Sequence, residues 1–508
     1  MIGALVFSLG IGYFYSLPYA SVLQGGGYRL AVYFRRAKRY IFLSVLHFCL
    51  FAAPLILAEV FLHNALKYFV CFFVFIVTSV LLFFLARSMR VHVTVTDRLV
   101  RLLITATLLS AVIVLPTYGT PLTLLCAALP ALAPIVLPLA ALILSPFERR
   151  NNRRYIRAAS ERLRSVPIRI GITGSYGKTT VKVFLDRLLS AGCDILATPA
   201  NYNTPLGIAK TVQTMNDGTE VFIAEMGARR TGDISELVEM VRPTEGILTG
   251  IAPQHLETFG NIENVMAEKE QLSLAIPSGK VYYNLADERV RELYARRDGA
   301  KVGVGYKDAD AILSDVAITV KGTSFRLRYK GFDISLDIPL LGRAAAEDFA
   351  LAATVAIDHG IHAEEIQIVA KRLSVVPHRM EVIHQGGLTV LDDSYNIDPV
   401  GAAAALETLS MLPAKRRIVY TSGMVELGAE TERLNEGYGI RIGEVCDVAL
   451  VQTSVYGDAV VRGIEKAGRG TNIIRVRDTE EATALFPSVV GAGDVLLVTA
   501  DLPRDYLL

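Results

Sequence analysis

The sequence predicts an α-helical membrane region at the N-terminus, followed by two α/β domains. Two observations support this prediction. Uncharged segments are concentrated before residue 147, and short strand-like runs alternate with amphipathic stretches from Pro167 onward, which is the pattern of βαβ units around a parallel sheet. We expect the membrane region over residues 1–150, a central domain over 151–376 and a smaller domain over 377–508.

Five apolar segments in the first part approach the ~20 residues that a helix needs to cross a bilayer. Loops rich in Lys and Arg follow the first, third and fifth segments, whereas the two loops between them contain only Lys67. The positive-inside rule then predicts a multi-pass protein of a bacterial-type cytoplasmic membrane, in contact with its lipids. Its N-terminus would lie outside and residues 146–508 in the cytoplasm. The segments are 1–24, 40–62, 68–86 and the two parts of 102–144 on either side of a turn at 116–121.

Charged residues are nearly balanced over the whole chain. The 52 Lys and Arg residues stand against 50 Asp and Glu residues, a formal net charge of +2, so no overall positive field favours nucleic acid as a partner. The five cysteines form no C-x-x-C pair and no metal-ligand spacing. We therefore expect neither a disulfide framework nor a zinc site.

A glycine-rich turn, "GSYGKT", separates a strand candidate at 168–174 from an amphipathic helix candidate at 179–192. The strict phosphate-loop pattern fails, because Ile172 occupies the position of its first glycine. Its physical requirements remain: glycines for a tight turn, a lysine charge, a hydroxyl for Mg²⁺ and a helix N-terminus that faces phosphate. These features predict an ATP site formed by Gly174, Ser175, Gly177, Lys178, Thr179 and Thr180.

Polar side chains follow the later strand candidates. Glu225 comes just after an apolar run in the segment 221–227, His255 follows another such run, and Asp393 lies just after the strand candidate that begins at 388. Open α/β sheets bind ligands at the carboxyl ends of their strands, and hard cations prefer carboxylate oxygen, so Glu225 is a candidate Mg²⁺ ligand. By spacing alone, a single histidine is more often structural than a ligand.

Six sequence blocks stand in the order in which they stand in one enzyme family. Together they resemble the Mur ligase family over roughly residues 167–508. The resemblance implies a P-loop-type central ATPase domain and a Rossmann-like C-terminal domain. The blocks are "GITGSYGKTT" (171–180), "NYNTPLG" (201–207), "EMGARRTGDISEL" (225–237), "HLETFGNIENVMAEKEQL" (255–272), "PHRMEVI" (377–383) with "DDSYNIDP" (392–399), and "SGMVELG" (422–428).

The resemblance implies an ATP-dependent, ADP-forming ligase. ATP would phosphorylate a carboxylate, and an amine would attack the acyl phosphate. The similarity is greatest to the family members that add D-alanyl-D-alanine to a muramoyl tripeptide in peptidoglycan synthesis for the cell wall. By the same resemblance, Lys178, Glu225, His255 and Lys269 are catalytic. Two Mg²⁺ ions would bind Thr179, Glu225, His255 and, if it is carbamylated, Lys269.

The resemblance also assigns binding residues outside the phosphate turn. Four residues of the C-terminal domain would contact the nucleotide, and domain closure would exclude water from the acyl phosphate. Two residues of the second block would contact the substrate. The nucleotide contacts are Arg379, Asp393, Tyr395 and Asn396, and the substrate contacts are Asn203 and Thr204.

The sequence departs from the family pattern in three places. Ala344, Ala345 and Asp348 stand where the family has a histidine and two asparagines, and the last strand ends in "TADLPRDY". The predicted spans also replace the usual UDP-sugar-binding domain, which makes a lipid-linked carboxylate a candidate substrate. Two alternatives stay open: a ligase for another envelope polymer, similar to poly-γ-glutamate synthetases, and an inactive membrane scaffold or nucleotide sensor.

Overall fold

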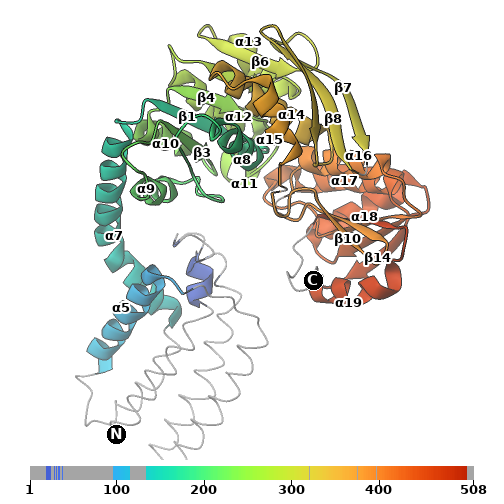
Figure 1. Cartoon of the computed structure of the whole chain (residues 1–508). Coiled ribbons are helices and arrows are strands. Elements are labelled where there is room, and N and C mark those ends of the chain that lie inside the picture. Colours follow the sequence, from blue (N-terminus) through green and yellow to red (C-terminus); the bar gives the residue numbers. More distant parts are fainter. Residues whose placement is uncertain are drawn as a thin grey trace, which may run out of the picture. The chain divides into compact units, whose positions relative to one another are not determined.

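The structure is a computed structural model that describes residues 133–499 except 320, 375 and 396, residues 95–114, and short pieces between 19 and 37. The chain divides into two compact units, Met1–Arg153 and Arg154–Leu508. Figure 1 shows the elements of both units, coloured along the sequence.

The described part of the first unit contains helix α5 (Asp97–Val114) and the first two thirds of α7 (Ala133–Leu163), which continues into the second unit. The Thr96 hydroxyl accepts a hydrogen bond from Leu99 N at 3.2 Å and so caps the N-terminus of α5. Leu99 and Leu137 are buried in an apolar cluster shared by the two helices. An ion pair of 2.8 Å between Arg98 and Glu148 also joins them.

The predicted membrane region is wrong. Within the described ranges, no helix is both long and apolar enough to span a bilayer. Helix α5 begins with Asp97 and Arg98, and α7 continues from its apolar first half into the polar and charged residues 148–154, so the apolar part of each described helix is shorter than the ~20 residues required. The multi-pass membrane location with an outside N-terminus is corrected by the same finding. Three of the predicted spans lie outside the described residues, apart from 19–24: 1–24, 40–62 and 68–86.

Nine described strands form the first sheet of the second unit (Figure 1). Strands β2 to β7 pair in parallel, and β7 to β9 form an antiparallel extension. Strand β3 is buried along its whole length, as expected for a parallel strand that is covered on both faces. The order in space is β2 (Ile195–Ala197), β3 (Val221–Met226), β1 (Ile168–Thr173), β4 (Glu245–Leu248), β5 (Val281–Asn284), β6 (Lys301–Gly305), β7 (Ala311–Thr319), β8 (Gly322–Tyr329) and β9 (Phe332–Ile338).

Helices cover both faces of this sheet. On one face the core lies between the strands and three helices, and the Phe184 and Phe349 rings meet edge to face there, 5.6 Å apart. These helices are α8 (Lys178–Leu189), α14 (Arg343–Asp358) and α15 (Ala363–Lys371). The other face is covered by the end of α7 and by α9 (Pro205–Gln213), α10 (Asp233–Val241), α12 (Ile262–Leu274) and α13 (Glu288–Arg296). The short α11 (Leu256–Phe259) precedes α12.

Six described strands form a second sheet, in which only the β10–β11 pair is antiparallel. The order is β10 (Glu381–Gln385), β11 (Leu388–Asp392), β15 (Val495–Thr499), β12 (Arg417–Thr421), β13 (Val448–Gln452) and β14 (Asn472–Val476). Helices α16 (Pro399–Met411), α17 (Thr431–Val445) and α18 (Val455–Ala467) cover one face, and α19 (Thr479–Val489) covers the other. The 3₁₀ helix η4 (Gly428–Glu430) precedes α17. Residues 154–508 form one compact unit, so the predicted boundary at 376/377 stays a prediction.

Replacing Phe349 with Ala is expected to destabilise the second unit by about 3–5 kcal/mol, because the change leaves a cavity between α8, α14 and the sheet. Phe349 is 0% exposed and contacts the rings of Phe184 and Phe325. Urea unfolding followed by circular dichroism measures the loss. Ile368→Ala on α15 is the control, since Ile368 is 51% exposed, and it should change stability by less than about 0.5 kcal/mol. Equal effects would contradict this core.

Candidate active site

The turn between β1 and α8 packs closely against two other elements. Gly177 has φ 76°, a left-handed conformation that favours glycine, and a Cβ at this position would lie 2.7 Å from Asp348 Oδ1 on α14. A Cβ on Gly174 would collide with the Thr249 side chain, just after β4. Both glycines are therefore required for the turn to fit between β4 and α14.

The turn leaves the N-terminus of α8 open to an anion. Gly177 precedes the helix and provides no side-chain cap, so the partial positive charge of the first N–H groups faces the turn. Lys178 folds back over it and donates to Gly174 O at 2.7 Å and Ser175 O at 2.9 Å. Burial lowers the pKa of Lys178 to about 8, a shift that a bound phosphate would oppose.

Tyr176 anchors the turn to the rest of the central domain. Its hydroxyl donates to Asp287 Oδ2 at 2.7 Å, and Asp287 Oδ1 accepts from Val290 N at 2.9 Å at the start of α13. The ring lies against Gly250, where a Cβ would collide with it. Burial, and then the Asp287 charge, raise the pKa of Tyr176, so the phenol stays a neutral donor. Sequence reasoning missed Asp287, whose only local signal is that of a helix cap.

Glu225 lies under the first turn of α8, and both of its oxygens have partners. Oε2 accepts from Thr179 Oγ1 at 3.0 Å and from Lys182 Nζ at 2.9 Å, and Oε1 accepts from Asn203 Nδ2 at 3.1 Å. Burial alone would raise the pKa of Glu225, but the nearby Lys182 and Lys178 charges lower it below its usual value. An ionised carboxylate beside a hydroxyl is a set of hard oxygen donors that fits Mg²⁺.

Lys182 is a residue of this site that sequence reasoning missed. Its side chain is 3% exposed and that of Glu225 is 2% exposed, and Nζ also donates to the Ala200 carbonyl. The signal was the four-residue spacing from Lys178, which puts both side chains on one face of the helix. Two lysines beside one carboxylate leave a positive charge excess, and this excess favours an anionic ligand.

Lys269 of α12 is buried and isolated. It is 3% exposed, and within the described part of the chain no hydrogen bond or ion pair reaches its ammonium group. Burial, and then repulsion from Lys178, lower the pKa of Lys269 to about 7. A large fraction of the amine is therefore neutral near neutral pH, and a neutral amine is the nucleophilic form.

His255 pairs with Glu426 rather than with Glu225. It precedes α11 with φ 54°, and its Nδ1 makes a short contact with Glu426 of the segment before η4. In the part of the chain that the structure describes, ligand atoms from three His, Cys, Asp or Glu residues come within 4.8 Å of one another only at His378, Glu381 and Asp392. The predicted metal-binding role of His255 stays a prediction.

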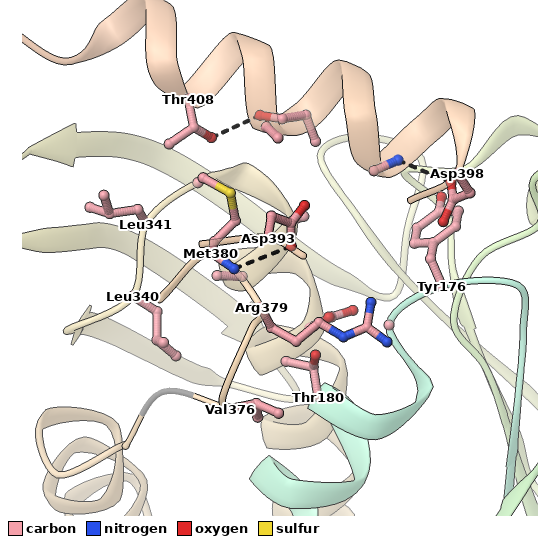
Figure 2. Close-up of a pocket in the computed structure, with 18 of the residues that line it drawn as sticks. Tyr176, Thr180, Leu340, Leu341, Val376, Arg379, Met380, Asp393, Asp398 and Thr408 are labelled. Atoms are coloured by element: carbon pink, nitrogen blue, oxygen red, sulfur yellow. Dashed lines mark hydrogen bonds between the residues drawn. The ribbon is translucent and has the colours of Figure 1, made fainter. Parts of the chain in front are cut away.

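A cavity of about 120 Å³ lies next to the turn, between the start of α8, the start of α14, the segment before β10 and helix α16. Figure 2 shows the Arg379 side chain reaching across it toward Thr180 and the loop that contains Tyr176. The Arg379 guanidinium lies 4.3 Å from the centroid of the Tyr395 ring. The cavity is therefore lined jointly by residues of the phosphate turn and of the predicted C-terminal domain.

The acidic lining of this cavity comes from both sides. Asp393 accepts from Met380 N at 3.2 Å, and burial raises the pKa of Asp393 to about 6 against the opposing Arg379 charge. Asp398 caps α16 by accepting from Val400 N and Gly401 N at 3.0 Å. The three residues that stand where the family has a histidine and two asparagines also line the cavity: Ala344, Ala345 and Asp348.

Of the remaining predicted site residues, some contact the site and others have a structural role or lie outside the described residues. Asn203 reaches the site, through its contact with Glu225. Thr204 caps α9, where its Oγ1 accepts from Gly207 N at 3.3 Å. This helix-capping role accounts for a threonine at this position, and substrate binding by Thr204 stays a prediction. Ser175 Oγ donates to Ala252 O at 3.1 Å and supports the turn. Asn396 lies outside the described residues.

Two family matches cover most of the second unit. Residues 172–356 match the Mur ligase middle domain, and residues 378–502 match the Mur ligase, glutamate ligase domain. The chain belongs to the Mur ligase family and is an ATP-dependent, ADP-forming ligase. It is 31% identical over 361 residues to the UDP-N-acetylmuramoyl-tripeptide–D-alanyl-D-alanine ligase of Mycobacterium tuberculosis, a match that covers 65% of this chain and 70% of that protein. The ligase of the same name from Escherichia coli is 28% identical over 290 residues, 56% of this chain and 63% of that protein.

Solved structures of two ADP complexes have a similar fold. MurF ligase from Thermotoga maritima in complex with ADP matches with a TM-score of 0.62 and 24% identity, over 70% of this chain and 81% of that chain. Mycobacterium tuberculosis folylpolyglutamate synthase complexed with ADP matches with a TM-score of 0.55 and 16% identity, over 68% of this chain and 90% of that chain. These likenesses show the mixed-sheet α/β fold.

Replacing Lys182 with Met is expected to destabilise the second unit by about 3–5 kcal/mol near neutral pH, because the buried Glu225 carboxylate would lose its ion-pair partner. Urea unfolding over a range of pH measures the loss. The folded-state pKa of Glu225 is lowered, so its stabilising effect is present above its ordinary pKa of ~4.3 and is lost as the pH falls through the folded value.

The difference in the free energy of unfolding between wild type and Lys182→Met should therefore become smaller on acidification. Arg296→Met is the control, since Arg296 pairs with Glu292 on the surface at 3.3 Å, and its cost should stay below about 1 kcal/mol. A gap that does not change with pH would contradict the Lys182–Glu225 pairing.

Proposed function

We propose that this ligase joins D-alanyl-D-alanine, or a similar amine, to the carboxylate of a muramoyl peptide in peptidoglycan synthesis. The observation that supports this substrate is the 31% identity to the Mycobacterium tuberculosis ligase named for that reaction. The observation that supports the chemistry is the glycine turn with Lys178 folded over it, above the Glu225 carboxylate.

The phosphates of ATP would bind the α8 N-terminus and Lys178, with Thr180 and the turn residues around them. Attack of a carboxylate on the γ-phosphate brings two anions together, and fixed positive charge at the transferred group lowers that barrier. Mg²⁺, when bound, would add further charge neutralisation there. Thr179 and Glu225 are the residues proposed to hold one ion, and His255 and Lys269 belong to the proposed second site.

Lys182 has a positioning role in this proposal. It keeps Glu225 ionised and holds one carboxylate oxygen at 2.9 Å, while Asn203 holds the other. The carboxylate is thereby oriented before any ligand binds. This pre-organisation reduces the rearrangement that metal and substrate binding would otherwise require.

The C-terminal residues Arg379, Asp393 and Tyr395 would contact the nucleotide from the other side of the cavity. Arg379 stacks on Tyr395 and reaches toward the phosphate turn (Figure 2), which places a second cation near the bound anion. Closure of the two sides around this cavity would exclude water and so protect the acyl phosphate from hydrolysis.

A second amine, glutamate, has specific support. The C-terminal match is to a glutamate ligase domain, and the folylpolyglutamate synthase has the same fold. The lipid-linked acceptor expected from the sequence is not part of this proposal, since it depended on the predicted membrane region.

Lys178→Ala is expected to lower turnover by at least about 10²–10³-fold, because it removes a fixed charge from the transferred phosphoryl group. The assay supplies ATP, Mg²⁺ and a UDP-linked muramoyl tripeptide with either D-alanyl-D-alanine or glutamate, and it measures ADP release and the amide product by mass spectrometry. Lys210→Ala, an exposed lysine of α9, is the control. ADP release without an amide product for either amine would contradict the proposed ligase activity and favour an inactive or sensor role.

Lys269 is expected to form a carbamate with CO₂, converting a buried cation into an anion that supports a metal ion. Only the neutral amine reacts, and the pKa of Lys269 is lowered to about 7, so carbamylation should fall as the pH drops below that value. Carbon-13 NMR of protein equilibrated with labelled bicarbonate measures it, and Lys269→Ala should lose the signal. An equal signal from Lys269→Ala, or one that grows on acidification, would contradict this assignment.

A further inference from the structure

Asp348 is a buried carboxyl group at the edge of the cavity, beside the phosphate turn. It belongs to α14, is 7% exposed, and lines the cavity. Its Oδ1 lies 2.7 Å from the point that a Cβ on Gly177 would occupy, so the carboxyl group is packed against the backbone that faces the phosphates.

Asp348 differs from the other two aspartates of the cavity in its hydrogen bonding. Asp393 accepts from one backbone N–H and Asp398 from two. Among the described residues, no donor reaches the Asp348 carboxyl group, and no ion pair includes it. A buried polar group without a partner is costly, so its position facing a ligand cavity indicates that a ligand supplies the missing partner.

The charges around Asp348 disfavour its ionised form. Burial, and then repulsion from Glu347, raise the pKa of Asp348 well above its usual value, and Arg379 opposes the shift only in part. Any nucleotide bound at the turn would add further negative charge. The titratable and charged groups around this region are Tyr176 in the turn, Lys178 at the start of α8, Glu347 on α14, and Arg379, Asp393 and Asp398 from the C-terminal side.

We infer that Asp348 binds the nucleotide as a neutral carboxylic acid, whose O–H donates a hydrogen bond to an acceptor atom of that nucleotide. The inference rests on the proposed function, because it takes the cavity as part of the ATP site. A neutral carboxyl group offers one donor and one acceptor, as the amide of asparagine does, whereas an ionised one offers acceptors alone and would repel the phosphates.

An ionised Asp348 that accepts hydrogen bonds would give the nucleotide affinity the opposite pH dependence to a neutral Asp348 that donates one. An ionised Asp348 would accept hydrogen bonds from ribose hydroxyls, as acidic residues do in dinucleotide sites, and nucleotide affinity would then fall on acidification. A neutral Asp348 donor binds a proton together with the nucleotide wherever the unliganded carboxyl group is ionised. Affinity then falls as the pH rises, by up to about tenfold per pH unit for one linked proton.

Calorimetric titration of the full chain with ADP distinguishes the two roles. Titrations from about pH 6 to about pH 9, in buffers of different ionisation enthalpy, give the affinity and the number of protons taken up. Asp348→Asn keeps a neutral donor. It should bind ADP within about threefold of wild type at the acidic end, and take up fewer protons than wild type at the alkaline end. Lys178 and Asp393 titrate in both proteins, so the difference in proton uptake between wild type and Asp348→Asn reports on Asp348 alone.

Asp186→Asn is the matched control, since burial also raises the pKa of Asp186 and that residue lies farther along α8. It should behave as wild type. Asp348→Ser, which keeps a smaller neutral donor, serves if the Asn variant unfolds. An ADP affinity of the wild type that falls on acidification while that of Asp348→Asn does not, or a loss of more than about tenfold in the affinity of Asp348→Asn at every pH, would overturn the inference alone. Failure of the wild type to bind ADP would overturn the proposed function and the inference with it.

Discussion

The close packing of residues 174–177 between β4 and α14 is the constraint on which the site depends. Gly177 has no side chain, so Asp348 of α14 can approach the turn, and the bulk of Tyr176 fills the space above Gly250. The sheet order β3–β1–β4 brings these elements together. The turn therefore links the central sheet to α13 through Asp287, and to α14 through Asp348.

The second feature on which the proposed chemistry depends is an excess of buried positive charge at the site. The ammonium groups of Lys178 and Lys182 lie near the ionised carboxylate of Glu225, and Lys178 also repels Lys269. Burial lowers the pKa values of Lys178 and Lys269 toward neutrality. Without a ligand this excess positive charge is poorly solvated. An anion such as a nucleotide phosphate, or a carbamate on Lys269, would relieve it, and this is a physical reason for the site to bind anions.

The cavity beside the turn has more acidic than basic side chains, the reverse of the lysine-rich turn. Three aspartates and one guanidinium line it, and burial raises the pKa values of all three carboxyl groups. Two of them use backbone N–H groups to remain acceptors. The nucleotide proposed to bind here would therefore place its phosphates at the lysine-rich turn and its remaining part among carboxyl groups, of which Asp348 is the one without a donor in the described structure.

Sequence reasoning succeeded where the signal was local. Alternating strand and helix patterns from Pro167 onward located the α/β elements, and the glycines and Lys178 located the turn, because turn geometry and helix polarity depend on a few adjacent residues. It failed for the membrane region. Three of the five predicted spans lie outside the described residues, apart from 19–24. For the other two, the hydropathy of a segment did not predict the helix limits, because α5 and α7 include charged residues beside their apolar parts.

The sequence by itself determined the order of the elements, the phosphate turn and the family resemblance. Only the tertiary structure decided the partners of its functional groups. Glu225 and Lys182 are separated by 43 positions and His255 and Glu426 by 171, and Asp348 reaches Gly177 through the packing of α14 on α8. Such contacts depend on how helices pack on the sheets. The hydrophobic effect that drives this packing is non-directional, so it brings together residues that are far apart in the sequence and that no local pattern relates.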